Sequence, residues 1–481
     1  MTVDVPGIPA TEEPLPVASP IDPTRPVVHL TPRQWARKNL FPTPMASLLT
    51  VVFALALGYG LFRMAWFAFV SSDWEIVRAN LRVFMIGRFP IEEAWRLWAA
   101  LYVAAATAGL FSGAIVAQSY AQAESSGRPV ERPGRWSWLR RYWPALACVA
   151  VILSQTRTWT PLLATLGAGL VLAGSRWLGL RLPGLARYLV VGLLVALILV
   201  YTLVAGSGGG LWSLADAVQL ALIAGAVLAS TRALGRRPIR FAVLALIMGA
   251  VLSAQLATGE EGVGWNDWGG LHLTLFVTIG GIALSFPLGV LVALGRRSSL
   301  PVLRSLSVGY IELIRGVPLV ALLFLGQYVI PLFFPNTVEP PSPLARALIA
   351  IVLFEAAYVA ETVRGGLQSI SRGQREAGQA LGLSSWKITR LIVLPQALRA
   401  VIPAMVGQFI SLFKDTSLLQ IIGFLELLEV AENTASQPRF LGQGLHTVTF
   451  AFVALIYWAG SYTMSRESRR LEGRLGVGER R

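Results

Sequence analysis

Residues 371–395 read SRGQREAGQALGLSSWKITRLIVLP, a polar stretch that separates two long apolar segments. Gly382 divides this stretch, because glycine adopts a left-handed turn that residues with a Cβ resist. Ser384 or Ser385 can cap a helix that follows the turn, and Pro395 lies beyond the end expected for that helix. We therefore expect two short helices joined by a tight turn. The apolar side chains of the second helix suit a groove on a partner protein.

The composition indicates a membrane protein. Hydrophobic residues make up 54% of the 481 residues and charged residues only 14%, whereas soluble domains carry about 25% charged residues. The mean hydropathy is +0.61. A spanning helix needs about 20 mostly apolar residues, and this criterion predicts an all-α protein with about twelve spans. The expected spans lie near 46–68, 95–119, 143–156, 159–176, 187–207, 211–230, 238–257, 271–294, 317–336, 344–364, 400–422 and 445–463.

The placement of charge agrees with this topology. The chain carries 41 Lys and Arg against 26 Asp and Glu, a formal net charge of +15. The basic residues gather in segments that the alternation of spans places in the cytoplasm, as the positive-inside bias requires, while 259–270 and 424–444 are acidic. Topology therefore explains the charge without nucleic acid, and both termini are expected in the cytoplasm. An amphipathic segment, 71–94, is expected at the outer membrane interface.

Few residues are available for metal or nucleotide chemistry. Cys148 is the single cysteine, which excludes an intrachain disulfide, and three histidines are present. These counts argue against a Cys/His metal site. The chain also lacks the Gly-x-x-x-x-Gly-Lys-[Ser/Thr] phosphate loop. We therefore expect no cofactor in this chain and no nucleotide hydrolysis by it alone.

The stretch 371–395 resembles the coupling loop of ABC importer permeases. That loop has the pattern Glu-Ala-Ala, three residues, Gly, nine residues, Ile, any residue, Leu-Pro. The residues at these spacings are Glu376, Ala377, Gly382, Ile392, Leu394 and Pro395, with Gly378 in place of the second Ala. The resemblance implies contact with a separate ATPase. Glu376, expected at the start of the first helix, can complement the helix dipole or pair with a basic group on that ATPase.

Flanking motifs narrow the resemblance to permeases for polar amino acids. YIELIRGVPL at 310–319 and AYVAETVRGG at 357–366 look like that family, which the chain resembles over about 265–475. The N-terminal half, with its motif at 35–41, looks similar to the longer subunit of general L-amino acid uptake systems. The resemblance implies a type I ABC importer permease core of about five transmembrane helices, preceded by additional N-terminal ones, in the bacterial inner membrane.

The family also implies a transport subunit for polar L-amino acids rather than an enzyme. Its partners would be an ATPase subunit that binds ATP and Mg, a second homologous permease subunit, a periplasmic or extracellular amino acid-binding protein, and membrane lipid. The expected divisions are a mobile cytoplasmic tail at 1–44, a transmembrane extension at 45–257, the permease core at 258–465 with the coupling loop at 371–398, and a cytoplasmic tail at 466–481.

Charged residues at membrane depth are costly, so they mark candidate positions on a transport path. Glu355 lies in an apolar segment and can contact a substrate ammonium or pair with another buried group. Four polar residues interrupt a later span, where they can line the path or serve structure or gating. They are Lys414, Asp415, Thr416 and Ser417. Glu361 is expected to pair with Arg364 or Arg315.

Two other classes of function compete with an ABC importer subunit. An ion-coupled secondary amino acid transporter needs no ATPase and usually shows internal repeats, and the halves of this sequence show none. A membrane-embedded enzyme needs a metal-ligand cluster or a nucleophile motif, and the sequence carries neither. Stoichiometric co-purification of an ATPase would favour the importer.

Overall fold

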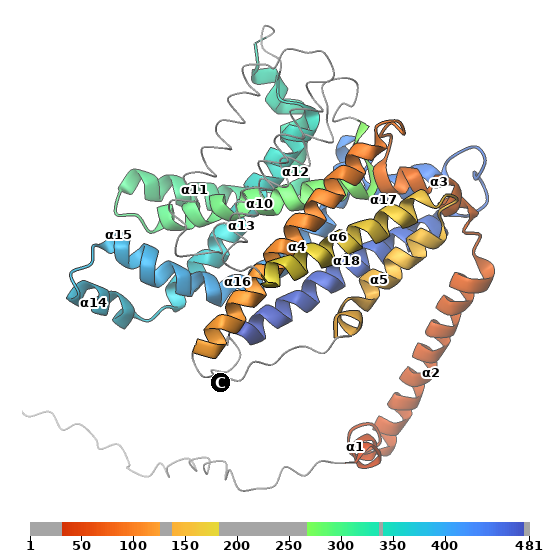
Figure 1. Ribbon diagram of the computed structural model, residues 1–481, viewed down its shortest axis with the longest axis horizontal. Coiled ribbons are helices and arrows are strands. Elements are labelled where there is room, and N and C mark those ends of the chain that lie inside the picture. Colours follow the sequence, from red (N-terminus) through yellow and green to blue (C-terminus); the bar gives the residue numbers. More distant parts are fainter. Residues whose placement is uncertain (1–30, 126–136, 182–266, 336–339, 476–481) are drawn as a thin grey trace, which may run out of the picture. The chain divides into compact units, whose positions relative to one another are not determined.

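The computed structural model describes residues 31–125, 137–181, 267–335 and 340–475, and the chain divides into two compact units, Met1–Ser72 and Asp73–Arg481 (Figure 1). The described residues form helices joined by turns. Their β structure is limited to two isolated bridges, Gly87 with Trp268 and Gly270 with Glu426. The expected all-α class is therefore confirmed.

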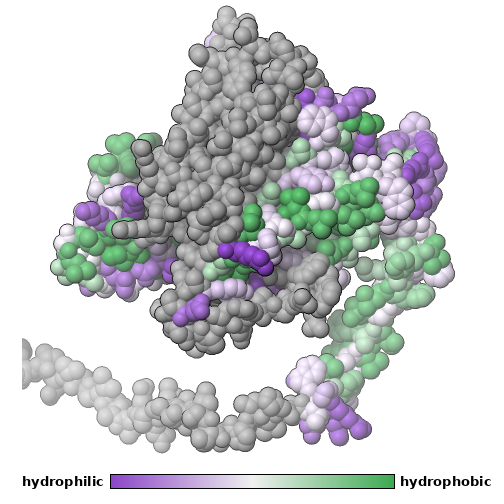
Figure 2. Space-filling model, in the orientation of Figure 1, coloured by the Kyte–Doolittle hydropathy of each residue, from purple (hydrophilic) through white to green (hydrophobic). Residues whose placement is uncertain are grey.

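In the first unit, α1 (Pro32–Asn39) leads through a short turn into α2 (Pro44–Trp66), which continues as the π-helix η1 (Phe67–Ser71). Thr31 caps α1, because its hydroxyl accepts from the Gln34 N–H while the Gln34 side chain accepts from the Thr31 N–H. α2 exposes apolar side chains on all sides, and Figure 2 shows green residues along it. Such a helix is typical of a membrane span in contact with lipid.

The second unit holds the other described helices. They are α3 (Glu75–Ile86), α4 (Ala94–Ser125), α5 (Ser137–Ser154), α6 (Thr160–Arg181), α10 (Gly270–Arg296), α11 (Pro301–Gly316), α12 (Leu319–Phe324), η3 (Leu325–Val329), η4 (Ile330–Phe333), α13 (Pro343–Ser369), α14 (Arg372–Ala380), α15 (Ser385–Ile388), η5 (Thr389–Val393), α16 (Leu394–Asp415), η6 (Thr416–Ile422), α17 (Leu427–Ala435) and α18 (His446–Leu475). α4 packs along α6, and α5 packs on α18. α13 is central and contacts α10, α11, α12 and α16.

Six described helical segments are long and apolar enough to cross a membrane, or seven when the bent pair that begins with α11 counts as one span. The six are Pro44–Ser71, Thr160–Arg181, Gly270–Arg296, Pro343–Ser369, Ser385–Ile422 and His446–Arg470. The expected total of about twelve is not confirmed. Three of the expected spans, 187–207, 211–230 and 238–257, lie outside the described residues.

The span expected at 317–336 corresponds to the helical segment Leu319–Phe333, and the chain bends sharply just before it. The helices Pro301–Gly316 and Leu319–Phe333 meet at 105°. Val317 between them is extended, with φ −107° and ψ 134°. A residue before proline avoids the helical region, since the proline ring clashes with it there. Pro318 therefore separates the two helices.

The amphipathic segment expected at the outer membrane interface packs its apolar face into the protein core. Ile76, Val77 and Phe84 of α3 are fully buried, and the Phe84 ring lies 5.2 Å from that of Phe452 on α18. α3 also contacts α10 and α17. Its apolar face is thus covered by protein rather than lipid, which a hydrophobic pattern alone cannot distinguish.

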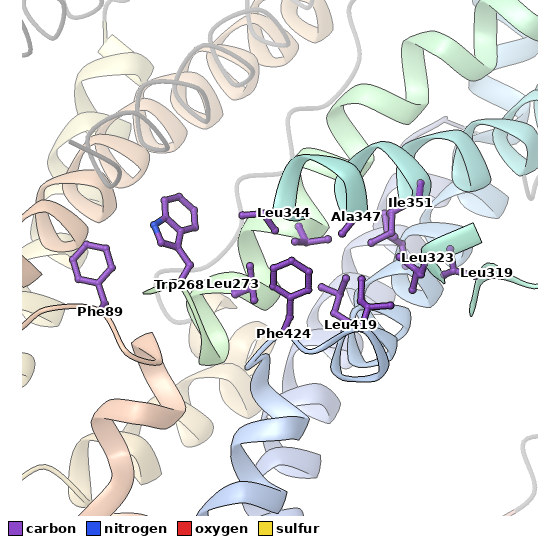
Figure 3. Close-up of a cluster of buried hydrophobic side chains, with 14 residues drawn as sticks. Phe89, Trp268, Leu273, Leu319, Leu323, Leu344, Ala347, Ile351, Leu419 and Phe424 are labelled. Atoms are coloured by element: carbon purple, nitrogen blue, oxygen red, sulfur yellow. The ribbon is translucent and has the colours of Figure 1, made fainter. Parts of the chain in front are cut away.

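The main core lies where α10, α12, α13 and η6 converge. Figure 3 shows side chains of all four elements in one cluster, among them Leu273 of α10, Leu323 of α12, Ile351 of α13 and Leu419 of η6. A second buried cluster joins α10, α11 and α13 to α15, η5 and α16. This second cluster supports the segment 371–398 between α13 and α16.

Candidate functional site

Helix α14 ends in a turn that requires glycine. The Leu383 N–H donates to the Gly378 carbonyl at 3.1 Å, and the Gly382 N–H donates to the Gln379 carbonyl at 2.8 Å. These two bonds form a Schellman motif, whose left-handed residue is Gly382 with φ +70°. The left-handed turn expected from the sequence is therefore present.

The second helix continues further than the sequence indicated. Ser384 occupies the N-cap position of α15, although its side chain makes no capping bond. α15 then runs through the π-helical turn η5 into α16, so Ser385–Ile422 form one continuous helical segment. Pro395 does not follow the end of a helix. It stands inside the continuous segment, at the second residue of α16 and directly after the π-helical turn η5.

One part of the predicted coupling motif faces the core. Gly378 is buried against α15, and a Cβ at this position would lie 2.9 Å from Ile388 Cγ1. Ile388 itself is buried in the second cluster, on which Leu394 also packs. Ile392 and Pro395 are half-buried. These residues attach the segment to α13 and α11 and leave little surface for a partner.

The other part of the motif faces outward. Glu376 and Ala377 are exposed, and the large apolar side chains of Leu381 and Trp386 are 78% and 62% exposed. Glu376 has no ion-pair partner among the described residues. It is the fifth residue of α14, beyond the first turn, so the expected complement to the helix dipole is wrong. An exposed acid beside exposed apolar side chains is typical of a protein-docking surface.

Glu361 fixes three arginines at the same end of α13. It pairs with Arg364, as expected, and with Arg296 of α10 at 3.3 Å between Nη1 and Oε2. Arg315 of α11 lies 4.0 Å away. The Glu361 carboxylate therefore joins three helices. Arg296 could not be predicted as its partner, because that residue is 65 positions distant in the chain.

The candidate path residues fall into two groups. Glu355 is 1% exposed on α13 and accepts a 3.3 Å bond from the Gln408 amide of α16. Its second oxygen has no hydrogen-bond partner among the described residues. Asp415 is half-buried and interacts electrostatically with Glu355. The negative charge of Asp415 on α16 therefore acts on Glu355 of α13.

The remaining path candidates do not join that pair. Lys414 is exposed at the end of α16, whereas Thr416 is fully buried and donates its hydroxyl to the Phe413 carbonyl at 2.7 Å. Ser417 is half-buried in η6. Adjacent residues on a helix point in different directions, which explains why the four do not share one surface.

Sequence reasoning missed a buried carboxyl outside the spans. Glu426, assigned to an acidic outer loop, is completely buried and caps α17 by accepting from the Leu428 and Glu429 N–H groups at 2.9 and 2.8 Å. Tyr457 donates to the same carboxyl at 3.2 Å. Burial raises the pKa of Glu426 to about 7, although these three donors act in the opposite direction and the charge of Glu429 adds to the rise. The apolar periodicity of α17 was the available indication.

Residues 285–476 match the family described as "Binding-protein-dependent transport system inner membrane component". The inner membrane amino-acid ABC transporter permease protein YhdY of Escherichia coli (strain K12) is 47% identical over 218 residues, which cover 45% of this chain and 59% of that protein.

A second relative matches over nearly the full length of both chains. The glutamate/glutamine/aspartate/asparagine transport system permease protein BztC of Rhodobacter capsulatus is 31% identical over 485 residues, which cover 94% of this chain and 95% of that protein. Among solved structures, a chain from the crystal structure of an amino acid ABC transporter with histidines is 28% identical. It covers 42% of this chain and 90% of that chain, with a TM-score of 0.38.

Proposed function

Because the chain belongs to the amino-acid permeases of binding-protein-dependent ABC transporters, we propose that it carries polar L-amino acids inward with energy from a separate ATPase docked on 371–398. Members of this family are transport subunits of the inner membrane rather than enzymes. The described spans agree with a multi-pass protein of that membrane.

The main support for this proposal is the exposed surface of the segment 371–398, called the coupling segment below. Glu376, Leu381 and Trp386 are exposed on a segment whose other side is fixed to the core. Burying large apolar side chains on a partner is favourable by about 25 cal/mol per Å² of apolar surface. The exposed carboxylate can add a charge-assisted contact to a basic group. A motion of α13 or α16 would move this surface directly, because no flexible linker intervenes.

We propose the substrates from the names of the relatives and the chemistry of the path. Glutamate, glutamine, aspartate and asparagine are the transported amino acids in the name of BztC. Glu355 and Asp415 can attract the ammonium group that every amino acid carries. Lys414, Thr416 and Ser417 would then have structural roles or contact substrate only transiently.

The other subunits follow from the same family. An ATPase would bind ATP and Mg, a second homologous permease subunit would complete the path as a heterodimer, and a periplasmic or extracellular binding protein would deliver substrate. Both termini would be cytoplasmic, in the topology predicted from the basic segments. A periplasmic reporter fused after Arg481 should be inactive, and an active one would contradict this topology.

Reconstitution tests the proposal. Proteoliposomes that contain this chain, the second permease subunit and the ATPase should accumulate labelled glutamate or glutamine when ATP is enclosed and binding protein is outside. A hydrolysis-deficient ATPase serves as the matched control and should abolish accumulation. Accumulation by this chain alone under an ion gradient would overturn the proposal in favour of a secondary transporter.

A further inference from the structure

A basic cavity of about 340 Å³ opens where α10 passes into α11. Four guanidinium groups, one hydroxyl and one amide form its lining, contributed by Arg296, Arg297, Ser298, Arg304, Arg364 and Gln368. α10 is a candidate span that ends at Arg296. The cavity therefore lies at the end of this candidate span, close to the segment 371–398.

The positive charge of this cavity is mostly uncompensated. Glu361 pairs with Arg296 and Arg364, whereas Arg297 and Arg304 have no acidic partner in the described part of the chain. Burial and the neighbouring charge of Arg375 on α14 lower the pKa of the Arg297 guanidinium. Two of the four lining arginines thus share one carboxylate and the other two have none, and this excess of positive charge favours an anion in the cavity.

The donors suit a phosphate group in particular. Arginine presents a planar fork of N–H groups that matches phosphate oxygens in bidentate geometry. The Ser298 oxygen accepts from the Leu300 N–H at 3.1 Å, so its own O–H remains to donate. Arg297 uses one N–H on the Leu367 carbonyl at 3.0 Å and retains others for a ligand.

Exposed apolar side chains adjoin this basic cavity on both helices. Leu291 lies five residues before Arg296 on α10, and Leu300, Leu303 and Leu306 lie around Arg304 at the start of α11; all four leucines are exposed. A free phosphate ion would leave these side chains uncovered, and an acidic peptide would not need them. Acyl chains attached to a phosphate would cover them.

We propose that this cavity binds the phosphate of an anionic phospholipid headgroup, with the acyl chains along the exposed leucines of α10 and α11. Basic pockets between membrane helices at the cytoplasmic surface are suited to such headgroups. A bound lipid would reduce the repulsion among the arginines. It would also connect α10 to the end of α13 through Arg297 and Leu367, immediately before the coupling segment begins.

The test is a lipid titration of the purified full chain. Detergent-solubilised protein is titrated with phosphatidylglycerol, and native mass spectrometry measures the ratio of lipid-bound to free protein. Each arginine near an anionic lipid contributes about a five-fold gain in affinity. The double variant Arg297→Gln/Arg304→Gln should therefore bind phosphatidylglycerol about 25-fold more weakly. These two arginines are chosen because their removal leaves no buried carboxylate unpaired.

Matched controls separate this site from general attraction to lipid. Arg399→Gln removes one positive charge at an exposed arginine outside the cavity, as Arg304→Gln does inside it, and should retain wild-type binding. Arg304→Lys keeps the charge and should bind more tightly than Arg304→Gln. Equal phosphatidylglycerol binding by the double variant and the wild type would overturn the proposal.

Further titrations test the ligand class. Phosphatidylcholine should bind much more weakly than phosphatidylglycerol, and equal binding of the two would overturn the proposal. Inorganic phosphate at millimolar concentration should not displace the bound lipid; displacement would indicate a site for free phosphate. Failure of the isolated chain to retain any phosphatidylglycerol would likewise reject a lipid site, whatever the outcome of the transport assays.

Discussion

Substituting Gly382 by valine should weaken the contact with the ATPase through the backbone alone. A Cβ at this position would meet no atom within 4 Å, so the added side chain has room. The residue has φ +70°, however, where a side chain costs about 1–2 kcal/mol, with a β-branched residue near the upper value. Because the space at Cβ is open, the cost comes from the backbone conformation and not from a steric clash at Cβ.

The expected loss of affinity for the ATPase follows from how far the substitution destabilises the turn. A penalty of 1–2 kcal/mol changes the equilibrium between the closed and opened turn by roughly 5- to 30-fold. Opening breaks the bond from Leu383 to Gly378 and separates Leu381 from Trp386, which lie on either side of the turn. The apparent affinity for the ATPase should therefore fall by up to that factor, because only the closed fraction binds.

The assay is binding of the ATPase to the membrane-embedded subunit, together with substrate-stimulated ATP hydrolysis and uptake at equal membrane amounts. Gly373→Val is the matched control, since Gly373 is also open to solvent but lies outside the left-handed region. Gly382→Asn should retain more affinity than Gly382→Val, because asparagine tolerates the left-handed region. Wild-type affinity and uptake in Gly382→Val would refute the reasoning.

Three further predictions concern charge, packing and pH. Glu376→Lys should weaken ATPase binding by about 1.5–3 kcal/mol, the contribution of a charge-assisted contact, with normal membrane insertion. Gly366→Ala should lower the thermal midpoint, because its Cβ would lie 2.4 Å from Val401 Cγ1 and 2.8 Å from the Ala397 carbonyl; overpacking of this kind costs about 1–3 kcal/mol. The pKa of Glu426 is about 7, above its ordinary 4.5. The raised pKa therefore stabilises the folded protein fully below pH 4.5, and about 3 kcal/mol of this stabilisation is lost as pH rises through 7.

Each of these predictions has its own control. Glu376→Gln removes the charge without reversing it and should lose less affinity than Glu376→Lys; equal affinities of the two variants and the wild type would exclude a charged contact. Gly365→Ala adds a methyl group where nothing lies within 4 Å, so it should not lower the thermal midpoint. For Glu426, thermal midpoints of the detergent-solubilised protein from pH 5 to 8 should fall in the wild type and change less in Glu426→Gln. Identical pH profiles would contradict a buried titrating carboxyl at this position.

The coupling segment shows how far the sequence could predict a site. The spacing from Glu376 to Pro395 and the turn at Gly382 are local properties, and they were predictable because backbone sterics act within a few residues. The division of the motif into an inward part with Gly378 and an outward part with Glu376 was not predictable. It depends on the cluster behind the segment, to which distant residues such as Ile311 contribute.

The sequence by itself determined the class of the protein, because a long apolar segment in lipid must satisfy its own backbone hydrogen bonds and therefore forms a helix. The break before Pro318 can also be predicted from the sequence, because it depends only on the residue that precedes a proline. Only the tertiary structure decided that α3 is covered by protein, that Arg296 shares Glu361 with Arg364, and that Glu426 is buried. Hydropathy and dihedral preference belong to a segment alone, whereas burial and ion pairing depend on which distant segments pack against it.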